Sequence, residues 1–359
     1  MKGLQRLRIV GIAVLATVAM TGCAATAAAT TPSATTLSDP PAAELRLGYF
    51  ANVTHAPALV GIRKGFFAKE LGTTKLSTEI FGAGPETIEA LSSGAIDAAY
   101  IGPSPAINSY IKSGGASVKV VSGAAIGGAE LVVRAGISTP SQLKGTTLAT
   151  PQLGNTQDVA LRSWLATKGL TSHLTGGGDV TITPTDNAQT LALFAAGKLD
   201  GAWLPEPWAS RLVLEAKAHV LLNEAKLWPG GKFATTALVV NSSYLAAHPT
   251  TVEALVKGNV DSVDWLNGNP ATAASVINAA LTKDAGKPLS ADVIGRALAN
   301  VTFSSDPLAG TAKTLVAHSV AVGTGKAGSL SGLFDLTLLN RVLRASGRPT
   351  VSAAGLGSD

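Results

Sequence analysis

The side chains that most often carry out catalysis or bind metals are few in this sequence, and they are spread apart. The single cysteine, Cys23, lies near the N-terminus, and the five histidines follow no metal-ligand spacing: His55, His173, His219, His248 and His318. No G-x-S-x-G, H-E-x-x-H or G-x-x-x-x-G-K-[ST] motif is present, so no nucleophile elbow, zinc protease site or phosphate loop is indicated. We therefore expect a protein that is not an enzyme and that needs no cofactor or metal.

Six turns made of small and polar residues adjoin the predicted strands, and these turns are the better candidates for a functional site. They read FANVTHAP, FGAGPET, IGPSPA, AAIGGAE, TPQLGNTQD and AWLPEPW. In open α/β sheets, ligands bind beyond the carboxyl ends of the strands, where such turns gather. Together the turns predict a binding site.

The turn TPQLGNTQD supplies four candidate ligand contacts: Gly154, Asn155, Thr156 and Gln157. Asn155 suits the N-cap of a helix, with Asp158 reaching back to it as in a capping box. The free N–H groups and the dipole at a helix start favour an anion. Asp158 would repel an anion unless an i,i+4 pair with Arg162 turns it aside. A helix start that is merely well capped is the alternative.

Two further turns also read as helix starts. In FGAGPET the candidates are Gly84, Pro85 and Glu86, because Pro85 suits the first helical position and Gly84 permits a close backbone approach. A structural turn and a ligand cradle both remain open there. In IGPSPA the candidates are Gly102 and Ser104, whose hydroxyl can face a ligand, although a plain helix cap would look the same.

The remaining candidates are polar or aromatic residues in the other turns: Asn52, His55, Gly128, Glu130, Trp203 and Glu206. His55 is expected near the mouth of the site, although a surface His needs no explanation. The carboxylate of Glu130 either pairs with a cation of the protein or contacts a ligand amine. Trp203 either lines an apolar pocket or belongs to the core.

Short strands alternate with helices from residue 44 onward, which is typical of an α/β fold. The first set begins with a strand at 45–50 and a helix at 56–71, and the second begins with a strand at 146–150. A β-prone strand at 234–245 then returns the chain, and helices follow it, one of them beginning near Asp306.

This order predicts two α/β lobes, each a mainly parallel sheet with flanking helices, joined by two hinge strands and followed by a helical C-terminal segment. Residues 44–133 and 234–359 would form the first lobe, and residues 134–233 the second. Two independent domains in series are the alternative.

The N-terminal region predicts export and anchoring to a membrane. Residues 1–22 combine basic residues with an apolar run at 9–20 that is too short to span a bilayer, as in a signal peptide. Cys23 follows directly and fits a lipidation site, with ordinary cleavage nearby as the alternative. Residues 23–43 are rich in Ala, Thr and Pro and predict a flexible tether. The net charge of +5 is spread along 359 residues without a basic stripe, so nucleic acid is not an expected partner.

Three segments carry a resemblance to a known family: IFGAGPETIEALSSGAIDAAYIGPSPAI, STPSQLKGTTLATPQLGNTQDVALRSWL and TLALFAAGKLDGAWLPEPWASR. They resemble the nitrate/taurine/aliphatic-sulfonate family of solute-binding proteins of ABC importers, over roughly residues 45–245. The resemblance implies a type II periplasmic-binding-protein fold that closes on a small-molecule ligand. It also implies a permease and its ATPase subunit as partners.

We further expect a monomer, held by its lipid on the outer face of the cell membrane, or in the periplasmic space of a cell that has an outer membrane. Desulfinases and thiamine-pyrimidine synthases also resemble this family. They are the less favoured alternative, because their chemistry needs a cysteine that the mature domain lacks.

The sequence leaves the charge of the ligand open. None of the six turns contains Lys or Arg, which suits capture of a sulfonate, taurine or nitrate by neutral donors. Four carboxylates nevertheless lie in these turns: Glu86, Glu130, Asp158 and Glu206. They would suit an aminosulfonate, or a cationic or heterocyclic solute such as a vitamin or pyrimidine precursor.

Overall fold

The computed structural model describes residues 39–359, and these residues belong to one compact unit. The predicted signal peptide, the predicted lipidation site at Cys23 and most of the predicted tether lie outside the described residues. Among residues 39–359, no helix is both long enough and apolar enough to cross a membrane.

The first sheet has eight strands in the order β13-β12-β4-β10-β3-β1-β2, with β11 paired to β4. β1 lies parallel between β2 and β3, whereas β10 runs antiparallel to both β3 and β4. The central strands are almost fully buried, which explains their continuous apolar sequences. The strands are β1 (Glu44–Tyr49), β2 (Lys75–Ile80), β3 (Ala98–Ile101), β4 (Val118–Gly127), β10 (Ala234–Asn241), β11 (Val301–Phe303), β12 (Phe334–Asp335) and β13 (Gly357–Ser358).

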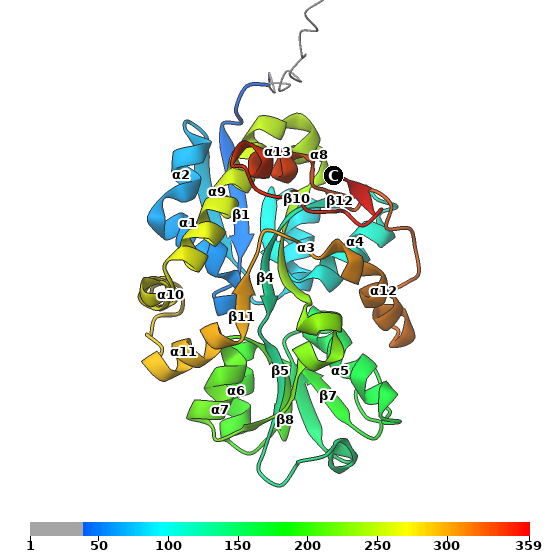
Figure 1. Ribbon diagram of the computed structural model, residues 1–359. Coiled ribbons are helices and arrows are strands. Elements are labelled where there is room, and N and C mark those ends of the chain that lie inside the picture. The colour runs from blue at the N-terminus through cyan, green and yellow to red at the C-terminus, as the bar shows by residue number, and fades with distance from the viewer. Residues whose placement is uncertain (1–38) are drawn as a thin grey trace, which may run out of the picture. The chain divides into compact units, whose positions relative to one another are not determined.

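Helices follow the first three strands and cover this sheet (Figure 1). The single helix expected at 56–71 is wrong, because the chain forms two helices, α1 and α2, separated by Gly65 at φ 75°. A glycine in the left-handed conformation ends a helix, since only glycine adopts it without a steric cost. These elements are η1 (Val53–His55), α1 (Ala56–Lys64), α2 (Phe66–Leu71), α3 (Gly84–Ser93) and α4 (Pro103–Lys112).

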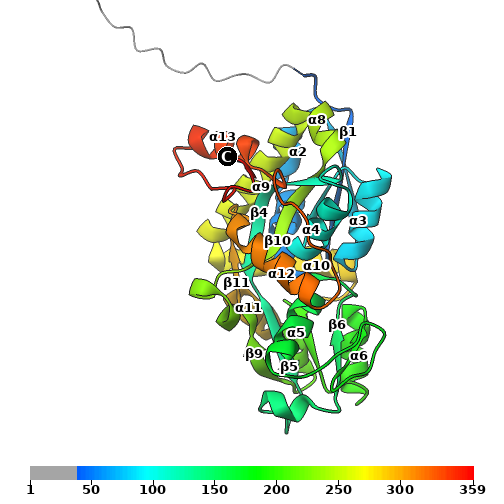
Figure 2. The ribbon, with the colours of Figure 1, turned by 90° about the vertical axis from the view of Figure 1, so that its right-hand side faces the viewer.

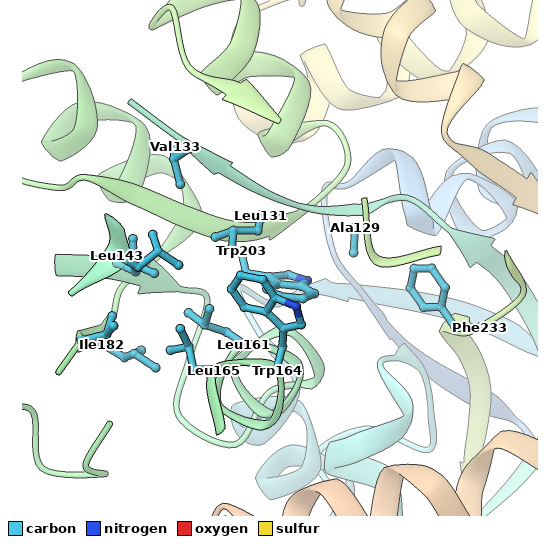
Figure 3. Close-up of a cluster of buried hydrophobic side chains, with 12 residues drawn as sticks. Ala129, Leu131, Val133, Leu143, Leu161, Trp164, Leu165, Ile182, Trp203 and Phe233 are labelled. Atoms are coloured by element: carbon cyan, nitrogen blue, oxygen red, sulfur yellow. The ribbon is translucent and has the colours of Figure 1, made fainter. Parts of the chain in front are cut away.

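The second sheet has five strands in the order β7-β6-β8-β5-β9. β6 is parallel to β7 and β8, whereas β5 is antiparallel to β8 and β9. Its elements are β5 (Ala129–Val133), η2 (Pro140–Leu143), β6 (Thr147–Thr150), α5 (Thr156–Thr167), β7 (Thr181–Pro184), α6 (Asn187–Ala195), β8 (Gly201–Pro205), α7 (Trp208–Glu215) and β9 (His219–Asn223). Figure 3 shows part of its core, where the indoles of Trp164 and Trp203 lie against each other with ring centroids 6.1 Å apart.

The chain crosses between the two sheets twice. β4 continues into β5 through Gly127 and Gly128, which have φ of 75° and 73°, and β9 leads through η3 (Glu224–Leu227) and η4 (Pro229–Gly231) to β10. Because β5 belongs to the second sheet, the first crossing comes before residue 134, the boundary expected from the sequence. The expected α/β fold with two sheets is confirmed. The sheets are mixed rather than mainly parallel, since β5 and β10, which adjoin the crossings, run antiparallel to their neighbours.

The C-terminal segment is mainly helical and packs on both sheets' helices. Helix α11 contacts α7, and α12 contacts both α4 and α5 (Figures 1 and 2). The helix expected near Asp306 begins only at Ala312, after the short turn η5 (Ala309–Thr311). The helices are α8 (Ser242–Ala247), α9 (Pro249–Gly268), α10 (Pro270–Ala285), α11 (Ala291–Ala299), α12 (Ala312–Ala321) and α13 (Thr337–Ala345).

Candidate ligand-binding cleft

Three helix starts, those of α3, α4 and α5, meet between the two sheets. Glycines make this approach possible, because a Cβ on Gly84 would lie 2.5 Å from Cγ of Pro105 and 3.0 Å from Oδ1 of Asn155. A Cβ on Gly102 would lie 2.5 Å from Oγ1 of Thr156. No N-cap side chain accepts a hydrogen bond at any of the three starts. Their dipoles therefore converge on a place that favours negative charge.

A small cavity, which we call the cleft, lies among these helix starts, η1 and β10. Its volume of about 20 Å³ has room for about one water molecule. Five of the candidate residues line it: Asn52, His55, Gly102, Asn155 and Gln157. The other lining residues are Phe50, Thr54, Gly82, Pro151, Asn187, Pro205, Thr235 and Thr236. The lining thus comes mainly from segments that connect the strands and helices of both sheets, and it contains no Asp, Glu, Lys or Arg.

His55 presents a neutral imidazole to the cleft. Its Nδ1 accepts a hydrogen bond from the backbone N–H of Phe50 at 3.2 Å, and the two rings are stacked with centroids 4.3 Å apart. Burial lowers the pKa of His55 to about 3, so the ring carries no charge at neutral pH. Because Nδ1 is the acceptor, Nε2 carries the proton and is a hydrogen-bond donor.

Unpartnered polar groups collect around the cleft. The hydroxyl of Thr236 and Oδ1 of Asn187, both in the lining, are buried and make no hydrogen bond within the described residues. The same holds for the hydroxyl of Ser104 at the start of α4, whose backbone N–H donates to Oγ1 of Thr156 at 3.3 Å. A buried polar group without a partner costs free energy, so such a cluster indicates a binding site.

The start of α5 differs from the expected capping box. Asn155 occupies the N-cap, but its side chain makes no capping hydrogen bond and its Nδ2 donates to Oε1 of Gln157. Asp158 accepts instead from the backbone N–H of Gly154 at 2.9 Å and from the hydroxyl of Thr150 at 2.9 Å. Asp158 is fully buried, and its carboxylate holds the turn that precedes α5 rather than capping the N-cap residue Asn155.

The expected pair of Asp158 with Arg162 is confirmed. Nε of Arg162 lies 3.0 Å from Oδ1 of Asp158, and both side chains are buried. This carboxylate is therefore neutralised within α5 and is not part of the cleft lining.

Glu86 serves its own helix start. Its Oε1 accepts hydrogen bonds from the backbone N–H groups of Gly82 and Ala83, which lie just before α3. This is half of a capping box, because Ala83 has no side-chain acceptor to complete it.

The buried carboxylates Glu130 and Glu206 both pair with Arg296 of α11, which is partly exposed, and we call these three residues the charge cluster. Nη2 of Arg296 lies 2.6 Å from Oε2 of Glu130, and Nη1 lies 3.1 Å from Oε1 of Glu206. Asn300 and Ser210 also donate hydrogen bonds to Glu206, and these bonds lower its pKa. Burial has the larger, opposite effect, so the pKa of Glu206 is raised. Glu130 thus pairs with a cation of the protein, as one of its two interpretations predicted.

Trp203 lies in the core of the second sheet. Its side chain is fully buried (Figure 3), and its Nε1 donates to Oε2 of Glu224 at 2.8 Å. Trp208, the other tryptophan of the same turn, is closer to the cleft, because its Nε1 donates to Oδ1 of Asn52 at 2.8 Å.

The remaining candidates flank the cleft without lining it. Gly84 and Thr156 fill the contacts between the helix starts, whereas Pro85 and Gly154 line an outer groove beside α3 and α4. Gly128 lies at the first crossing, where its carbonyl accepts the backbone N–H of Glu206 at 2.9 Å.

Sequence reasoning missed several lining residues, chiefly Thr54, Asn187, Thr235 and Thr236. Thr235 and Thr236 lie in β10, whose sequence ATTALVVN reads as a core strand. Two adjacent threonines in a strand that is otherwise apolar were the available signal. Asn187 follows the N-cap Asp186 of α6, and only the pairing of β7 with β6 brings it to the cleft.

Among residues 39–359, no group of three or more His, Cys, Asp or Glu side chains is arranged to hold a metal ion. The polar groups of the cleft are neutral hydroxyls, amides and one imidazole, together with backbone N–H groups. This chemistry can bind and release a polar solute by hydrogen bonding.

Residues 38–281 match the NMT1-like family. The chain belongs to this family. Two curated relatives are each similar to about 60% of the chain. The bicarbonate transport ATP-binding protein CmpC of Synechocystis is 29% identical over 241 residues, which cover 61% of this chain and 34% of that protein. The taurine-binding periplasmic protein of Escherichia coli is 27% identical over 218 residues, which cover 60% of this chain and 64% of that protein. The chain thus spans less than two thirds of either relative.

The fold is that of periplasmic binding proteins. The alkanesulfonate-binding protein SsuA of Xanthomonas axonopodis pv. citri, solved with MOPS bound, superposes with a TM-score of 0.68 at 24% identity. The superposition covers 81% of this chain and 96% of that one. The family resemblance and the two-lobed fold expected from the sequence are therefore confirmed.

Proposed function

We propose that this protein is an extracytoplasmic solute-binding lipoprotein of an ABC importer, and that it captures an aliphatic sulfonate or a related taurine-like or nitrate-like solute in the cleft. The observation that carries the proposal is the cleft itself: a cavity between the two sheets, at three converging helix starts, lined by uncharged donors. Membership of the NMT1-like family agrees with it.

The distribution of charge favours an anion or a neutral polar head group over a cation. The four carboxylates in the candidate turns all have protein partners: Glu86 with backbone N–H groups, Asp158 with Arg162, and Glu130 and Glu206 with Arg296. None of them lines the cleft. A fixed anion can be held by hydroxyls, amides and helix N-termini without a buried cation.

The size of the cleft implies that the solute enters by separation of the two lobes. A volume of about 20 Å³ is far below the ~300 Å³ or more of ordinary ligand pockets. Gly127 and Gly128 supply a flexible point at the first crossing, and η3 and η4 precede the second. Affinity is then a shift of population between open and closed forms.

A lipid on Cys23 and a tether at 23–43 would hold a monomer at the outer face of the membrane, where its closed form docks on the permease and the ATPase subunit drives transport. The protein binds solute without changing it. A folded protein that begins at residue 44 and stays soluble is the expected result of removing the tether.

Isothermal titration calorimetry with a panel of short alkanesulfonates, taurine, nitrate and pyrimidine precursors tests the ligand. We expect saturable binding of a sulfonate or nitrate with one site per chain. Binding of a pyrimidine precursor alone would reject the sulfonate but keep the transport role. Turnover of a sulfinate would reject the binding role in favour of an enzyme.

A pair of variants tests the place of binding. Thr236→Val removes an unpartnered hydroxyl from the cleft while keeping the shape of the side chain, and it should weaken solute binding by about 10-fold. Ser319→Ala removes another buried, unpartnered hydroxyl on α12, outside the cleft, and should leave affinity unchanged. Equal affinities for the two variants would place the solute elsewhere.

A further inference from the structure

A second cavity, which we call the side pocket, lies between α5, the turn η3 and α12. Its volume is about 160 Å³. Six side chains matter to its chemistry: Val159, Trp164, Glu224, Trp228, Leu315 and His318. A buried apolar cavity of about 150 Å³ holds a benzene molecule, so the side pocket has room for a small organic molecule.

Aromatic rings make up much of its wall. Trp164 and Trp228 both line it, and the ring of His318 lies 6.1 Å from that of Trp228, centroid to centroid. Nζ of Lys168 lies 5.9 Å from the Trp164 ring, at the outer limit of a cation–π contact, and the Lys168 side chain is exposed. Indole faces carry partial negative charge, so this wall attracts a positive group.

Glu224 adds a buried carboxylate to the same pocket. It is 1% exposed, and its only hydrogen-bond donors among the described side chains are two indoles, Nε1 of Trp203 at 2.8 Å and Nε1 of Trp228 at 3.3 Å. No Lys or Arg of the described residues pairs with it. Its two oxygens together can accept about four hydrogen bonds, so acceptor capacity remains. Burial raises the pKa of Glu224 to about 7.

The two indole donors use different oxygens of Glu224, Oε2 for Trp203 and Oε1 for Trp228. A carboxylate can accept at both oxygens, whereas a glutamine could accept at only one, because its amide nitrogen is a donor. A carboxylate without a protein cation, in a cavity walled by indoles and hydrocarbon, is the arrangement that binds alkylated ammonium ions.

We propose that the side pocket is a second ligand site, for a small organic ammonium ion whose alkyl groups contact Trp164, Trp228 and Leu315 and whose charge is balanced by Glu224. The site is separate from the cleft, because it lies along the middle of α5 rather than at its start. A cation held there lies between α5 and α12, and α12 also contacts α4, which follows a strand of the first sheet (Figure 2). Nothing in this proposal depends on the identity of the solute in the cleft.

Titration of the purified protein with tetramethylammonium chloride, followed by NMR of the indole N–H groups, tests the proposal. At about pH 8 the carboxyl of Glu224 is mostly ionised, and the lowered pKa of half-buried His318 keeps its ring neutral. We expect saturable shifts of the Trp164, Trp228 and Trp203 resonances, with Trp208 and Trp265 unchanged. Sodium chloride at equal concentration should give no saturable shift, and tert-butanol, a neutral molecule of similar size, should bind about 10-fold more weakly or worse.

Variants show whether the carboxylate provides the charge. Glu224→Gln should weaken tetramethylammonium binding by about 10-fold and leave tert-butanol binding unchanged. Glu79→Gln, at an exposed position on β2, is the matched control and should bind as the original protein does. Leu315→Trp, which fills the cavity from α12 and keeps Glu224, should abolish the shifts and serves if Glu224→Gln does not fold. The proposal is overturned if no indole shift saturates or if tert-butanol binds as tightly as tetramethylammonium. It is also overturned if Glu224→Gln binds tetramethylammonium as tightly as the original protein does.

Discussion

The cleft and the charge cluster both contain buried polar groups between the two lobes, but their groups are satisfied in opposite ways. In the charge cluster, Arg296 donates to both Glu130 and Glu206, and Asn300 and Ser210 complete the hydrogen bonds of Glu206. In the cleft, no lining residue is charged, and hydroxyl and amide atoms such as those of Thr236 and Asn187 lack partners in the described residues.

The charge cluster stabilises the fold, whereas the unpartnered groups of the cleft are available to a ligand. Charges that are removed from water need permanent partners, so the cluster is fixed by the fold. Neutral polar groups can be left without a partner at a smaller cost, and that cost is recovered when a solute binds. The four carboxylates of the candidate turns therefore stabilise the fold, and they do not indicate a cationic solute.

The largest expected effect comes from breaking the charge cluster. Arg296→Met leaves Glu130 and Glu206 buried without their cation, and we expect the free energy of unfolding to fall by about 3 kcal/mol or more. Urea denaturation measures it. Arg348→Met, which breaks a surface pair with Asp264, should cost about 1 kcal/mol or less. Similar losses for both variants would show that the cluster is no more important than a surface pair.

The pH dependence of stability extends the comparison to Glu224, a buried carboxylate whose hydrogen-bond donors within residues 39–359 are two indoles. Its pKa in the folded protein, about 7, lies above the ordinary value of 4.5, so folding favours the protonated form. The unfolded chain loses this proton first as the pH rises. Stability from this group is therefore complete below pH 4.5 and falls by up to about 3 kcal/mol as the pH passes 7, at about 1.4 kcal/mol per pKa unit.

Urea denaturation of the original protein and of Glu224→Gln over a pH series isolates this group. The difference in unfolding free energy between the two proteins should decline as the pH rises from 4.5 through about 7. A difference that stays constant with pH would contradict a raised pKa at Glu224.

A smaller effect is expected from crowding the cleft. In Gly102→Ala, the added Cβ would lie 2.5 Å from Oγ1 of Thr156 and would push the starts of α4 and α5 apart. We expect solute affinity to fall by about 10-fold, as measured by calorimetry. Gly295→Ala, at an exposed position on α11 with no heavy atom within 4 Å of the added Cβ, should keep full affinity. Unchanged affinity in Gly102→Ala would remove this contact from the site.

The smallest expected effect is that of pH on the affinity of the cleft for its solute. Because the pKa of His55 is lowered to about 3, its ring stays neutral across the range in which an ordinary histidine titrates. Solute affinity should change by less than about 2-fold between pH 5 and pH 8 in calorimetric titrations. A steep rise in affinity toward pH 5 would mean that a charged histidine holds the solute.

Much of the fold followed from local patterns. The alternation of strands and helices, the return strand after residue 233 and the helix starts at FGAGPET, IGPSPA and TPQLGNTQD follow from apolar runs and from Gly, Pro and Asn in turns. The errors arose where context overrides pattern. Gly65 divides one apolar periodicity into two helices, and β5 joins the second sheet although its sequence continues from the first.

The candidate site was predicted in part, for a physical reason. Asn52, His55, Gly102, Asn155 and Gln157 lie in turns that bear visible signals, and all five line the cleft. Thr235 and Thr236 lie in a strand, and nothing local distinguishes a hydroxyl that faces a cavity from one that faces a neighbouring strand. Trp203 lies in β8, and its side chain packs in the apolar core of the second sheet, where its Nε1 donates to Glu224.

The sequence by itself determined the class of fold, because strand and helix periodicity and turn composition are local properties. Three of its segments also carried the resemblance to the family. The tertiary structure decided that Glu130 and Glu206 do not line the cleft, since both pair with Arg296, which is distant from them in sequence. It alone placed Glu224 among three tryptophans from separate segments and left a cavity beside them, because a pocket exists only where packed elements fail to fill the space between them.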